Sequence, residues 1–441
     1  MMFDKNDLIE ATGAKVLKDN SCVSKFNIST DTRTITPNDI YLPLKGETFD
    51  GEKFIDKALE NGSKAYFTTS DFVFDNADFV LKVSDTKDAY MKIAQFYRNK
   101  INPVVVGITG SAGKTTTKEM VYSVLNYKFR THKTFSNHNN EIGFCQTILS
   151  MPEDTQMLIV EMGMRGLGEI DYITRYLNPD YAIVTNSGSA HVGRLGSLDN
   201  IAIAKCEIAN GLSNEGIFIS LNQDIIKKHL KFKGEKIFYS LDDVVVLERK
   251  PSYSKFEYKG NIYELNVEGD YNIENSLSAV NLGLKTGMTP EEIAKGLKTY
   301  HPIEKRWEVE GIKGYKFIND SYNANPESMK ASVKAFAELY PNPVVILGDM
   351  AELGNDEIRY HREVGEYLSS INKYVKYILV GKLACEIGKP LEIEGFEVEY
   401  FDNNEQVALY IVENLDKSNT IFLKASRAMK FEEILEKIKK E

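Results

Sequence analysis

The chain has 441 residues, 42% of them hydrophobic, and a formal net charge of −10. This length predicts about three domains, and the hydrophobic share is sufficient for packed cores. The excess of 64 acidic over 54 basic residues argues against a surface that binds nucleic acid through many phosphate contacts.

The four cysteines are far apart in the sequence and include no CxxC pair, which favours a reduced protein. The first 15 residues have no apolar run after a basic start, so we expect no signal peptide. No stretch approaches the roughly 18 consecutive apolar residues of a transmembrane helix. We therefore expect a cytoplasmic protein without a membrane span, and a monomer is our working expectation.

Residues 1–100 are expected to form a first domain, because they precede a glycine-rich loop and carry patterns of their own. Residues 41–44 are typical of a strand, and residues 54–59 begin a helical pattern. A second helical pattern over residues 85–99 leads to Asn102 and Pro103, where we place the domain boundary.

Polar residues and glycines gather in one part of this first domain. Hydroxyl, cationic and backbone donors of this kind suit a phosphorylated ligand, and a solvated loop with ordinary turn glycines is an equal alternative. The candidate ligand-binding residues are Thr32, Arg33, Lys45, Asp50 and Gly51.

The sequence VVVGITGSAGKTTTKEM, residues 104–120, predicts a strand, a glycine-bracketed turn and the start of a helix. Glycines let backbone N–H groups close on an anion, and the helix N-terminus adds partial positive charge. In such a loop the lysine reaches the β- and γ-phosphates, and the next hydroxyl holds Mg²⁺. Because the strict motif has glycine where this chain has Ile108, we interpret the loop as a variant phosphate loop, with a plain Gly/Ser turn as the alternative. Its residues are Gly110, Ser111, Ala112, Gly113, Lys114, Thr115 and Thr116.

Two further polar side chains follow strand patterns in the middle of the chain. Glu161 ends one strand, and His191 lies in a Gly/Ser loop after the next. Ligands of parallel sheets bind outside the carboxyl ends of the strands, so Glu161 is a candidate Mg²⁺ ligand and His191 a candidate metal or phosphate ligand. Taken alone, such a glutamate is more often a helix cap or surface group, and a lone histidine is usually structural. Their shared sheet edge with the phosphate loop reverses that preference. The expected strands, in a mostly parallel sheet, are 104–108, 157–160, 181–185 and 216–220.

Other polar residues of this region have two interpretations each. The asparagines of the segment SNHNNEIGF either wrap a substrate or nucleotide or form a plain polar loop; they are Asn137, Asn139 and Asn140. Lys205 lies on a predicted helix, where a lysine is normally solvated. Asn275, at the start of another helix, is either a cap or a base-binding amide.

Residues 304–441 are expected to form a third α/β unit after the middle unit of residues 101–303. Arg306 lies at the hinge between them. The expected strands end in polar turns, and strand ends are where such units hold ligands. These strands are 316–320, 344–349, 377–381, 397–401 and 420–424. The turn DSYNANP is the densest in polar groups and contains Asp320, Tyr322, Asn323 and Asn325.

Ten motifs, in order along nearly the whole chain, resemble the Mur ligase superfamily. They are ITGSAGKTTT, SNHNNEIGF, IVEMG, TNSGSAHVGRLGS, AKCEI, GDYNIENSLSA, KRWEV, DSYNANPESM, LGDMAELG and LKASRAMK. DSYNANP is the most specific of these motifs. It resembles the corresponding motif in the branch of the superfamily that adds D-alanyl-D-alanine. Departures from the family pattern are Phe144, Cys206 and Ala425, and they leave the reaction class unchanged.

The resemblance implies a three-domain α/β fold with assigned roles. Residues 1–100 would bind the UDP-muramoyl peptide, and residues 101–303 would form the ATPase domain around a mostly parallel sheet. Residues 304–441 would form a Rossmann-like domain that contacts D-alanyl-D-alanine and nucleotide. The implied reaction uses ATP to phosphorylate the carboxylate of UDP-N-acetylmuramoyl tripeptide, and the amine of D-alanyl-D-alanine then attacks the acyl phosphate.

The resemblance also implies roles for single residues. Two Mg²⁺ ions are implied, one held by Thr115 and Glu161 and the other by His191, with Lys205 carbamoylated into a carboxylate-like ligand. Lys114, His191 and Lys205 would be catalytic. The phosphate loop would hold the triphosphate, together with nucleotide contacts from Asn275, Arg306 and Asp320. The substrate contacts would come from the first-domain residues named above, the three asparagines, and Tyr322, Asn323 and Asn325.

Two other functions compete with this interpretation. One is another amide ligase of the superfamily, such as a folate polyglutamate ligase, but those enzymes lack a uridine-nucleotide domain ahead of the phosphate loop. The other is a non-catalytic nucleotide-gated scaffold, which the intact Lys114, Glu161, His191 and Lys205 argue against.

Overall fold

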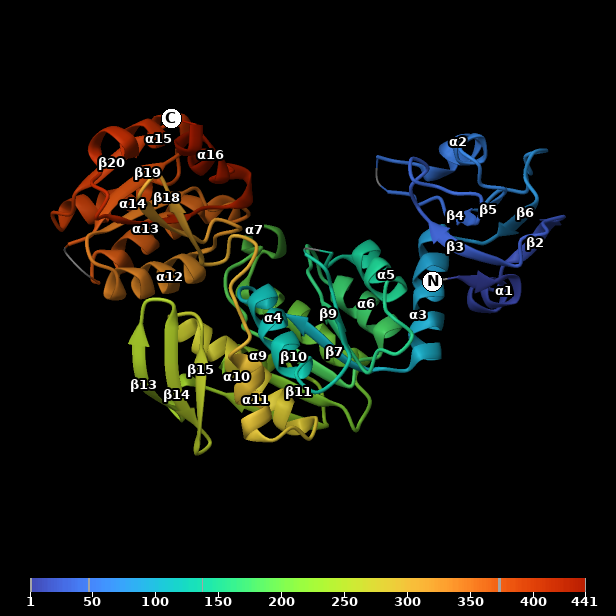
Figure 1. Cartoon of the computed structure of the whole chain (residues 1–441), viewed down its shortest axis with the longest axis horizontal. Coiled ribbons are helices and arrows are strands. Elements are labelled where there is room, and N and C mark those ends of the chain that lie inside the picture. Colours follow the sequence, from blue (N-terminus) through green and yellow to red (C-terminus); the bar gives the residue numbers. More distant parts are fainter. Residues whose placement is uncertain (1, 47, 137, 372–373, 441) are drawn as a thin grey trace. The chain divides into compact units, whose positions relative to one another are not determined.

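The computed structural model describes residues 2–46, 48–136, 138–371 and 374–440 (Figure 1). Its contacts divide the chain into two compact units. The first comprises Met1–Pro103 and His138–Thr155, and the second Val104–Asn137 and Gln156–Glu441. Within the described residues, no helix has the length and apolar character that crossing a bilayer requires.

The first unit is built on a six-stranded sheet of order β1-β3-β4-β5-β6-β2. The inner strands β3 to β6 pair in parallel, and the outermost strands β1 and β2 pair antiparallel. The strands are β1 (Phe3–Asp4), β2 (Lys15–Asp19), β3 (Lys25–Ser29), β4 (Asp39–Tyr41), β5 (Ala65–Thr68) and β6 (Phe79–Lys82). The helices are α1 (Lys5–Thr12), α2 (Ile55–Glu60), α3 (Thr86–Ile101) and α5 (Glu141–Leu149).

The strand expected at residues 41–44 ends at Tyr41, earlier than predicted. Pro43 lacks a backbone N–H, so the chain cannot continue a ladder through it. The helix expected over 85–99 is present as α3, which Asp85 caps through its side chain. Asn102 ends this helix in the left-handed conformation, one residue before the first unit's break at Pro103.

Helix α5 belongs to the first unit, although the sequence-based division placed its residues with 101–303. It packs along α3, with the Cys145 thiol 3.4 Å from the Met91 sulfur. The Tyr97 hydroxyl donates to the Met151 carbonyl at 2.7 Å and fixes the end of the same segment. No signal in the sequence marks this domain boundary, because short turns connect residues 138–155 to the segments before and after them.

The second unit contains two large sheets, of which the first is entirely parallel, with order β12-β11-β10-β7-β9-β8. Its strands are β7 (Val104–Thr109), β8 (Thr131–Lys133), β9 (Met157–Glu161), β10 (Tyr181–Val184), β11 (Ile217–Leu221) and β12 (Glu235–Tyr239). All four expected strands are present. The sequence analysis missed the outermost β8 and β12, which carry charged residues in place of an apolar run.

Helices cover this sheet, and a small antiparallel sheet follows it. The helices are α4 (Lys114–Leu125), α6 (Glu169–Leu177), α7 (Val192–Leu195), α8 (Leu198–Cys206), α9 (Asp224–His229), α10 (Asp270–Lys285) and α11 (Pro290–Leu297). The small sheet consists of β13 (Val244–Lys250), β14 (Tyr253–Tyr258) and β15 (Asn261–Leu265), which Figure 1 shows as adjacent yellow-green arrows. It was not expected from the sequence.

The second large sheet has order β16-β17-β21-β18-β19-β20 and is parallel except for the β16–β17 pair. Its strands are β16 (Glu308–Ile312), β17 (Tyr315–Asn319), β18 (Pro343–Gly348), β19 (Lys376–Val380), β20 (Val398–Phe401) and β21 (Thr420–Lys424), and its helices α12 (Pro326–Leu339), α13 (Glu357–Leu368), α14 (Cys385–Ile393), α15 (Asn404–Asn414) and α16 (Glu432–Lys440). All five expected strands are present within one residue, and only β16 was missed.

Trp307 is the central packing residue where the two large sheets of the second unit meet. It is buried, and its ring lies 6.0 Å from that of Tyr271 on α10 and 5.4 Å from that of Phe422 on β21. Trp307, Glu304 and Lys305 all have positive φ angles, which non-glycine residues rarely adopt. The linker is therefore held in one specific path by burial of the indole ring.

Glu274 on α10 predicts a pH dependence of stability. Burial, with a smaller contribution from the charge of Asp270, raises the pKa of Glu274 from 4.5 to about 7. The folded chain therefore binds a proton that the unfolded chain has released, and the free energy of unfolding falls as pH rises from about 4.5 to about 7. Glu274→Gln removes this effect. We expect the variant to be more stable than the parent at pH 8, by up to about 3 kcal/mol, with the gap narrowing toward pH 5. Urea unfolding at the two pH values measures it, and identical pH profiles for both proteins would contradict the assignment.

Candidate active site

The predicted phosphate loop connects β7 to α4. Gly110 ends the strand with φ of 154°, and a Cβ on it would collide with the Thr185 hydroxyl. Gly113 has φ of 77° and caps α4 at its N-terminus, so both positions require glycine. Lys114 begins the helix, and its Nζ donates back to the Gly110 carbonyl at 2.9 Å. The loop thus closes around its own lysine at the positive end of a helix.

The loop after β10 fixes the phosphate loop from outside. Asn186 accepts a hydrogen bond from the Ala112 N–H at 2.9 Å and donates to the Ala112 carbonyl at 3.1 Å. Thr185 donates to the same carbonyl at 2.6 Å. The Ser111 N–H donates to the Asn186 carbonyl at 3.0 Å. These bonds fix the loop against the segment after β10, and two of them use the N–H groups of Ser111 and Ala112.

Thr115 and Glu161 meet at the carboxyl ends of neighbouring strands. The Thr115 hydroxyl donates to Glu161 Oε2 at 2.9 Å, and both side chains are buried. Glu161 is the last residue of β9, where it pairs in register with Ile108 of β7. A hydroxyl and a carboxylate in direct contact beside a phosphate loop are oxygen ligands of the type Mg²⁺ prefers.

Two lysines of the site have lowered pKa values. Burial lowers the pKa of Lys114, while the charges of Glu161 and Glu352 oppose that shift. Lys205 on α8 is completely buried, and its Nζ has no hydrogen-bond partner among the described residues. Burial, together with the charge of Lys114, holds the pKa of Lys205 well below its usual value. A solvated helical lysine, the alternative left open by the sequence, is therefore excluded.

His191 lies in the loop after β10 and faces a carboxylate from the other sheet of the unit. Its Nδ1 is 2.6 Å from Glu352 Oε2, and Arg194 is 3.3 Å from the other oxygen of the same carboxylate. This contact lowers the pKa of Glu352. His191 and Glu352 both have positive φ angles, 68° and 64°, so both turns are held in unusual conformations.

The candidate nucleotide-binding residues differ in their contacts with the phosphate loop. Asn275 on α10 is buried, and its Oδ1 would lie 2.5 Å from a Cβ placed on Gly113. Its side chain therefore lies against the loop, whereas α10 is capped by Gly269 and not by this asparagine. Thr116 lies on the first turn of α4, near the buried Tyr300. The Arg306 guanidinium stacks on the Tyr322 ring at 3.9 Å.

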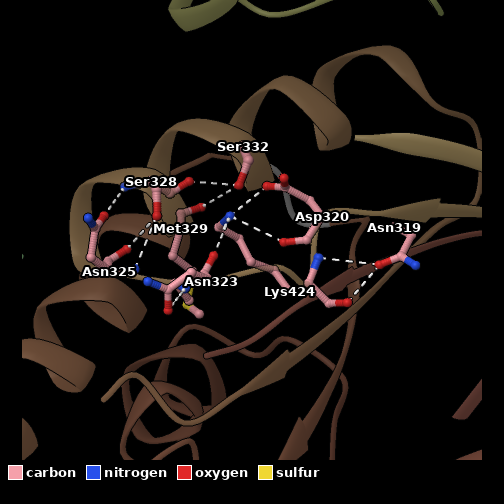
Figure 2. A network of polar contacts seen from close by, with 10 residues as sticks. Asn319, Asp320, Asn323, Asn325, Ser328, Met329, Ser332 and Lys424 are labelled. Carbon is pink, nitrogen blue, oxygen red and sulfur yellow. Dashed lines mark hydrogen bonds and ion pairs between the residues drawn. The ribbon is translucent and has the colours of Figure 1, made fainter. Parts of the chain in front are cut away.

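Figure 2 shows the polar network around the DSYNANP turn. Lys424 at the end of β21 is buried and forms an ion pair with Asp320 at 2.5 Å. Its Nζ also donates to the carbonyls of Asp320 and Asn323 at 3.4 and 3.3 Å. Asn325 caps α12 in a reciprocal capping box with Ser328. Asp320 and Asn325 therefore have structural roles here, and the Asn323 Oδ1 accepts a hydrogen bond from the Ala324 N–H.

The candidate residues of the first unit lie in two loops, one before β4 and one after it, and differ in exposure. Gly51 is buried where a Cβ would lie 2.6 Å from the Leu44 carbonyl, and Lys45 and Asp50 form an isolated antiparallel bridge beside it. The Thr32 carbonyl accepts a hydrogen bond from Asn61. Arg33 is 86% exposed and pairs with Asp31. Of the asparagines in the segment 136–144, Asn140 caps α5, Asn139 is half-buried, and Asn137 lies outside the described residues.

Several residues of the site were not singled out by sequence reasoning. Asn186, Glu352 and Lys118 were quoted only within longer motifs, and Lys118 lies on the second turn of α4. The spacing of Lys118 from Lys114 was the available signal, because residues four apart lie on one helix face. Across the described residues, no group of three or more His, Cys, Asp or Glu side chains is placed to hold a metal.

Sequence comparison gives a match over most of the chain. A curated relative from Bacillus subtilis (strain 168), UDP-N-acetylmuramoyl-tripeptide–D-alanyl-D-alanine ligase, is 37% identical over 423 residues, which cover 92% of each chain. The chain belongs to the Mur ligase family. Three models of that family match in succession: the "Mur ligase family, catalytic domain" at residues 26–103, the "Mur ligase middle domain" at residues 108–283, and the "Mur ligase, glutamate ligase domain" at residues 305–427.

Solved structures agree with this family assignment. The crystal structure I of MurF from Acinetobacter baumannii has a TM-score of 0.91 and 26% identity, and the match covers 100% of this chain and 99% of that one. The MurF ligase from Thermotoga maritima in complex with ADP has a TM-score of 0.83 at 26% identity, covering 94% and 97%. The expected three-domain α/β fold with a parallel central sheet is thereby confirmed.

Gly113 allows a matched test of the phosphate loop of this Mur ligase. An alanine there adds the strain of a left-handed residue, about 1 kcal/mol or more, and places its Cβ against Asn275. Gly260 has a similar φ, 72°, but open space around it. We expect Gly113→Ala to weaken ADP binding at least tenfold, and Gly260→Ala to leave binding unchanged at a similar stability cost. Calorimetric titration of ADP measures this, and equal affinities would show that the loop does not bind the nucleotide.

Proposed function

We propose that the chain is an ATP-dependent ligase that joins D-alanyl-D-alanine to UDP-N-acetylmuramoyl tripeptide, forming the UDP-muramoyl pentapeptide of peptidoglycan synthesis. The relative from Bacillus subtilis bears the name of this activity. The observation that carries the proposal is the Thr115–Glu161 contact beside the glycine-bracketed loop at one sheet edge. We take the cytoplasm as its compartment and the monomer as its active form.

The substrate carboxylate attacks the γ-phosphorus of ATP, the bond from that phosphorus to the β-γ bridging oxygen breaks, and ADP leaves. The amine of D-alanyl-D-alanine then attacks the acyl carbon, loses a proton, and phosphate leaves. The chain contributes positioning and charge neutralisation, which are the main sources of catalysis in phosphoryl transfer. The loop amides and Lys114 would bind the triphosphate, and Asn275, Arg306 and Asp320 would contact the remainder of the nucleotide.

Thr115, Glu161 and His191 are the residues that would hold Mg²⁺, and the ion would neutralise phosphate charge. The donor set fits, because Thr115 and Glu161 offer oxygens in contact at the mouth of the loop. His191 is paired with Glu352 in this structure. Because the pair uses Nδ1, the Nε2 of His191 remains available to a metal while Glu352 orients the ring. We also expect residues 304–441 to shift when nucleotide binds, because their nucleotide contacts must reach the phosphate loop.

Lys205 would complete the metal site as a carbamate. Its amine is buried and without a hydrogen-bond partner among the described residues, and its lowered pKa favours the neutral form. A neutral amine attacks CO₂, forming an N–C bond and releasing one proton, and the product carries a negative charge. This converts a cation that would repel Mg²⁺ into an anionic ligand and satisfies the buried nitrogen.

The remaining residues are proposed to bind the two peptide substrates. Tyr322, Asn323 and Asn325 would bind D-alanyl-D-alanine at the turn that Lys424 holds, and the asparagines after residue 136 would approach the acyl end of the tripeptide. The uridine nucleotide would be bound by the first unit, through Thr32, Arg33, Lys45, Asp50 and Gly51.

A folate polyglutamate ligase is disfavoured as an alternative by the family match over residues 26–103, which precede the phosphate loop.

An activity assay distinguishes the ligase from the non-catalytic scaffold. We expect phosphate release only when ATP, UDP-N-acetylmuramoyl tripeptide and D-alanyl-D-alanine are all present, and Lys114→Ala should reduce this rate at least a hundredfold. Assays with lysine- and diaminopimelate-containing tripeptides would identify the third stem residue. Equal turnover with a single amino acid in place of the dipeptide would exclude the proposed substrate.

The carbamate is tested separately. We expect Lys205→Ala to lose at least a hundredfold in rate and to regain part of it with short carboxylic acids, which supply the missing negative oxygen ligand. Lys100→Ala, which removes an exposed lysine of the first unit, is the control for added acid. Full activity of Lys205→Ala without added acid would rule out the carbamate.

A further inference from the structure

Lys118 is a fully buried lysine next to the predicted metal site. It lies on α4, one turn after Lys114, and its side chain has no solvent exposure. Its Nζ is 3.6 Å from Glu161 Oε2, 3.4 Å from Glu119 Oε1, and donates to the Ser136 carbonyl at 3.4 Å. No step of the proposed mechanism uses this residue.

The three acceptors around Lys118 come from three different segments. Glu161 ends β9 and is the candidate metal ligand. Glu119 directly follows Lys118 on α4, and Ser136 begins the asparagine-rich segment. Ser136 has φ of 49°, so its carbonyl is presented by an unusual backbone conformation. One ammonium group therefore ties the phosphate-loop helix, the metal ligand and the start of a candidate substrate loop together.

Positive and negative side chains alternate in a chain of ion pairs that includes Lys118. Lys133 at the end of β8 pairs with Glu119, Glu119 pairs with Lys118, and Lys118 pairs with Glu161. A buried charge is tolerated only when it is paired and hydrogen-bonded. An apolar side chain would fill the same space without desolvating an ammonium ion, so packing alone does not account for lysine here.

We infer that Lys118 is a positioning residue for the metal-bound nucleotide. It holds the Glu161 carboxylate toward Thr115 while leaving the phosphate loop, which is fixed by Asn186 and Thr185, unaffected. The inference rests on the proposed function, since it assigns Lys118 to the Mg²⁺ requirement of the same site. In this proposal Lys118 acts through Glu161, with which it forms an ion pair, and not by contact with the nucleotide.

The test separates metal-dependent from metal-independent nucleotide binding. ADP is titrated into the full chain by calorimetry, with and without Mg²⁺, for the parent, Lys118→Met and Lys118→Arg. We expect Lys118→Met to bind ADP without Mg²⁺ with a Kd within threefold of the parent's. The factor by which Mg²⁺ lowers this Kd should be at least tenfold smaller in the variant than in the parent. Lys118→Arg keeps the charge and should retain most of that tightening.

Lys133→Met is the matched control, because Lys133 also pairs with Glu119 but not with Glu161; it should behave as the parent. If Lys118→Met does not fold, Lys118→Met with Glu119→Gln removes one charge of each sign and carries the same expectation. Unchanged or stronger Mg²⁺ tightening in a folded Lys118 variant would overturn the inference. A parent in which Mg²⁺ has no effect on ADP binding would instead refute the proposed metal site itself.

Discussion

The structure of the candidate site depends on one hydrogen bond, from the Thr115 hydroxyl to Glu161. It joins the first turn of α4, which follows the phosphate loop, to the carboxylate of Glu161 at the end of β9. Because β7 and β9 are adjacent and parallel, Ile108 and Glu161 lie in register. The parallel sheet thereby delivers an anion-binding loop and a cation-binding carboxylate to the same edge.

Lysine side chains lie close to this hydrogen bond and to the Glu161 carboxylate. Lys114 is half-buried and Lys205 fully buried, and burial lowers the pKa of both. Lys118 is also buried and lies within ion-pair distance of the same carboxylate. Lys205 alone of the three has no acceptor within hydrogen-bond distance among the described residues.

Much of this arrangement could be predicted from the sequence. The strand–glycine–helix pattern located the phosphate loop, and apolar runs ending in Glu161 and before His191 located two further strand ends, because parallel strands place their carboxyl ends together. The strands β8, β12 and β16 were missed because they are short and include charged residues, which leaves at most three apolar residues in a row. The return of residues 138–155 to the first unit was missed because it depends on long-range packing of α5 on α3, which leaves no local signal.

Side-chain pairings were harder to predict than positions. The ion pair between His191 and Glu352, 161 residues apart in number, joins two loops whose contact depends on the arrangement of the second unit. The ion pair between Asp320 and Lys424 likewise joins the ends of two strands that only the sheet order makes adjacent (Figure 2). Asn325 and Asn140 proved to be helix caps, a role that the sequence pattern allowed but could not separate from ligand binding.

The most direct measurement of the central claim is the position of a metal ion in crystals of this chain grown with ADP and Mn²⁺, located by anomalous scattering. The account predicts a peak at bonding distance from the Thr115 hydroxyl or the Glu161 carboxylate, with the diphosphate on the loop of residues 110–116. Manganese bound elsewhere, with the Thr115–Glu161 hydrogen bond intact, would contradict it.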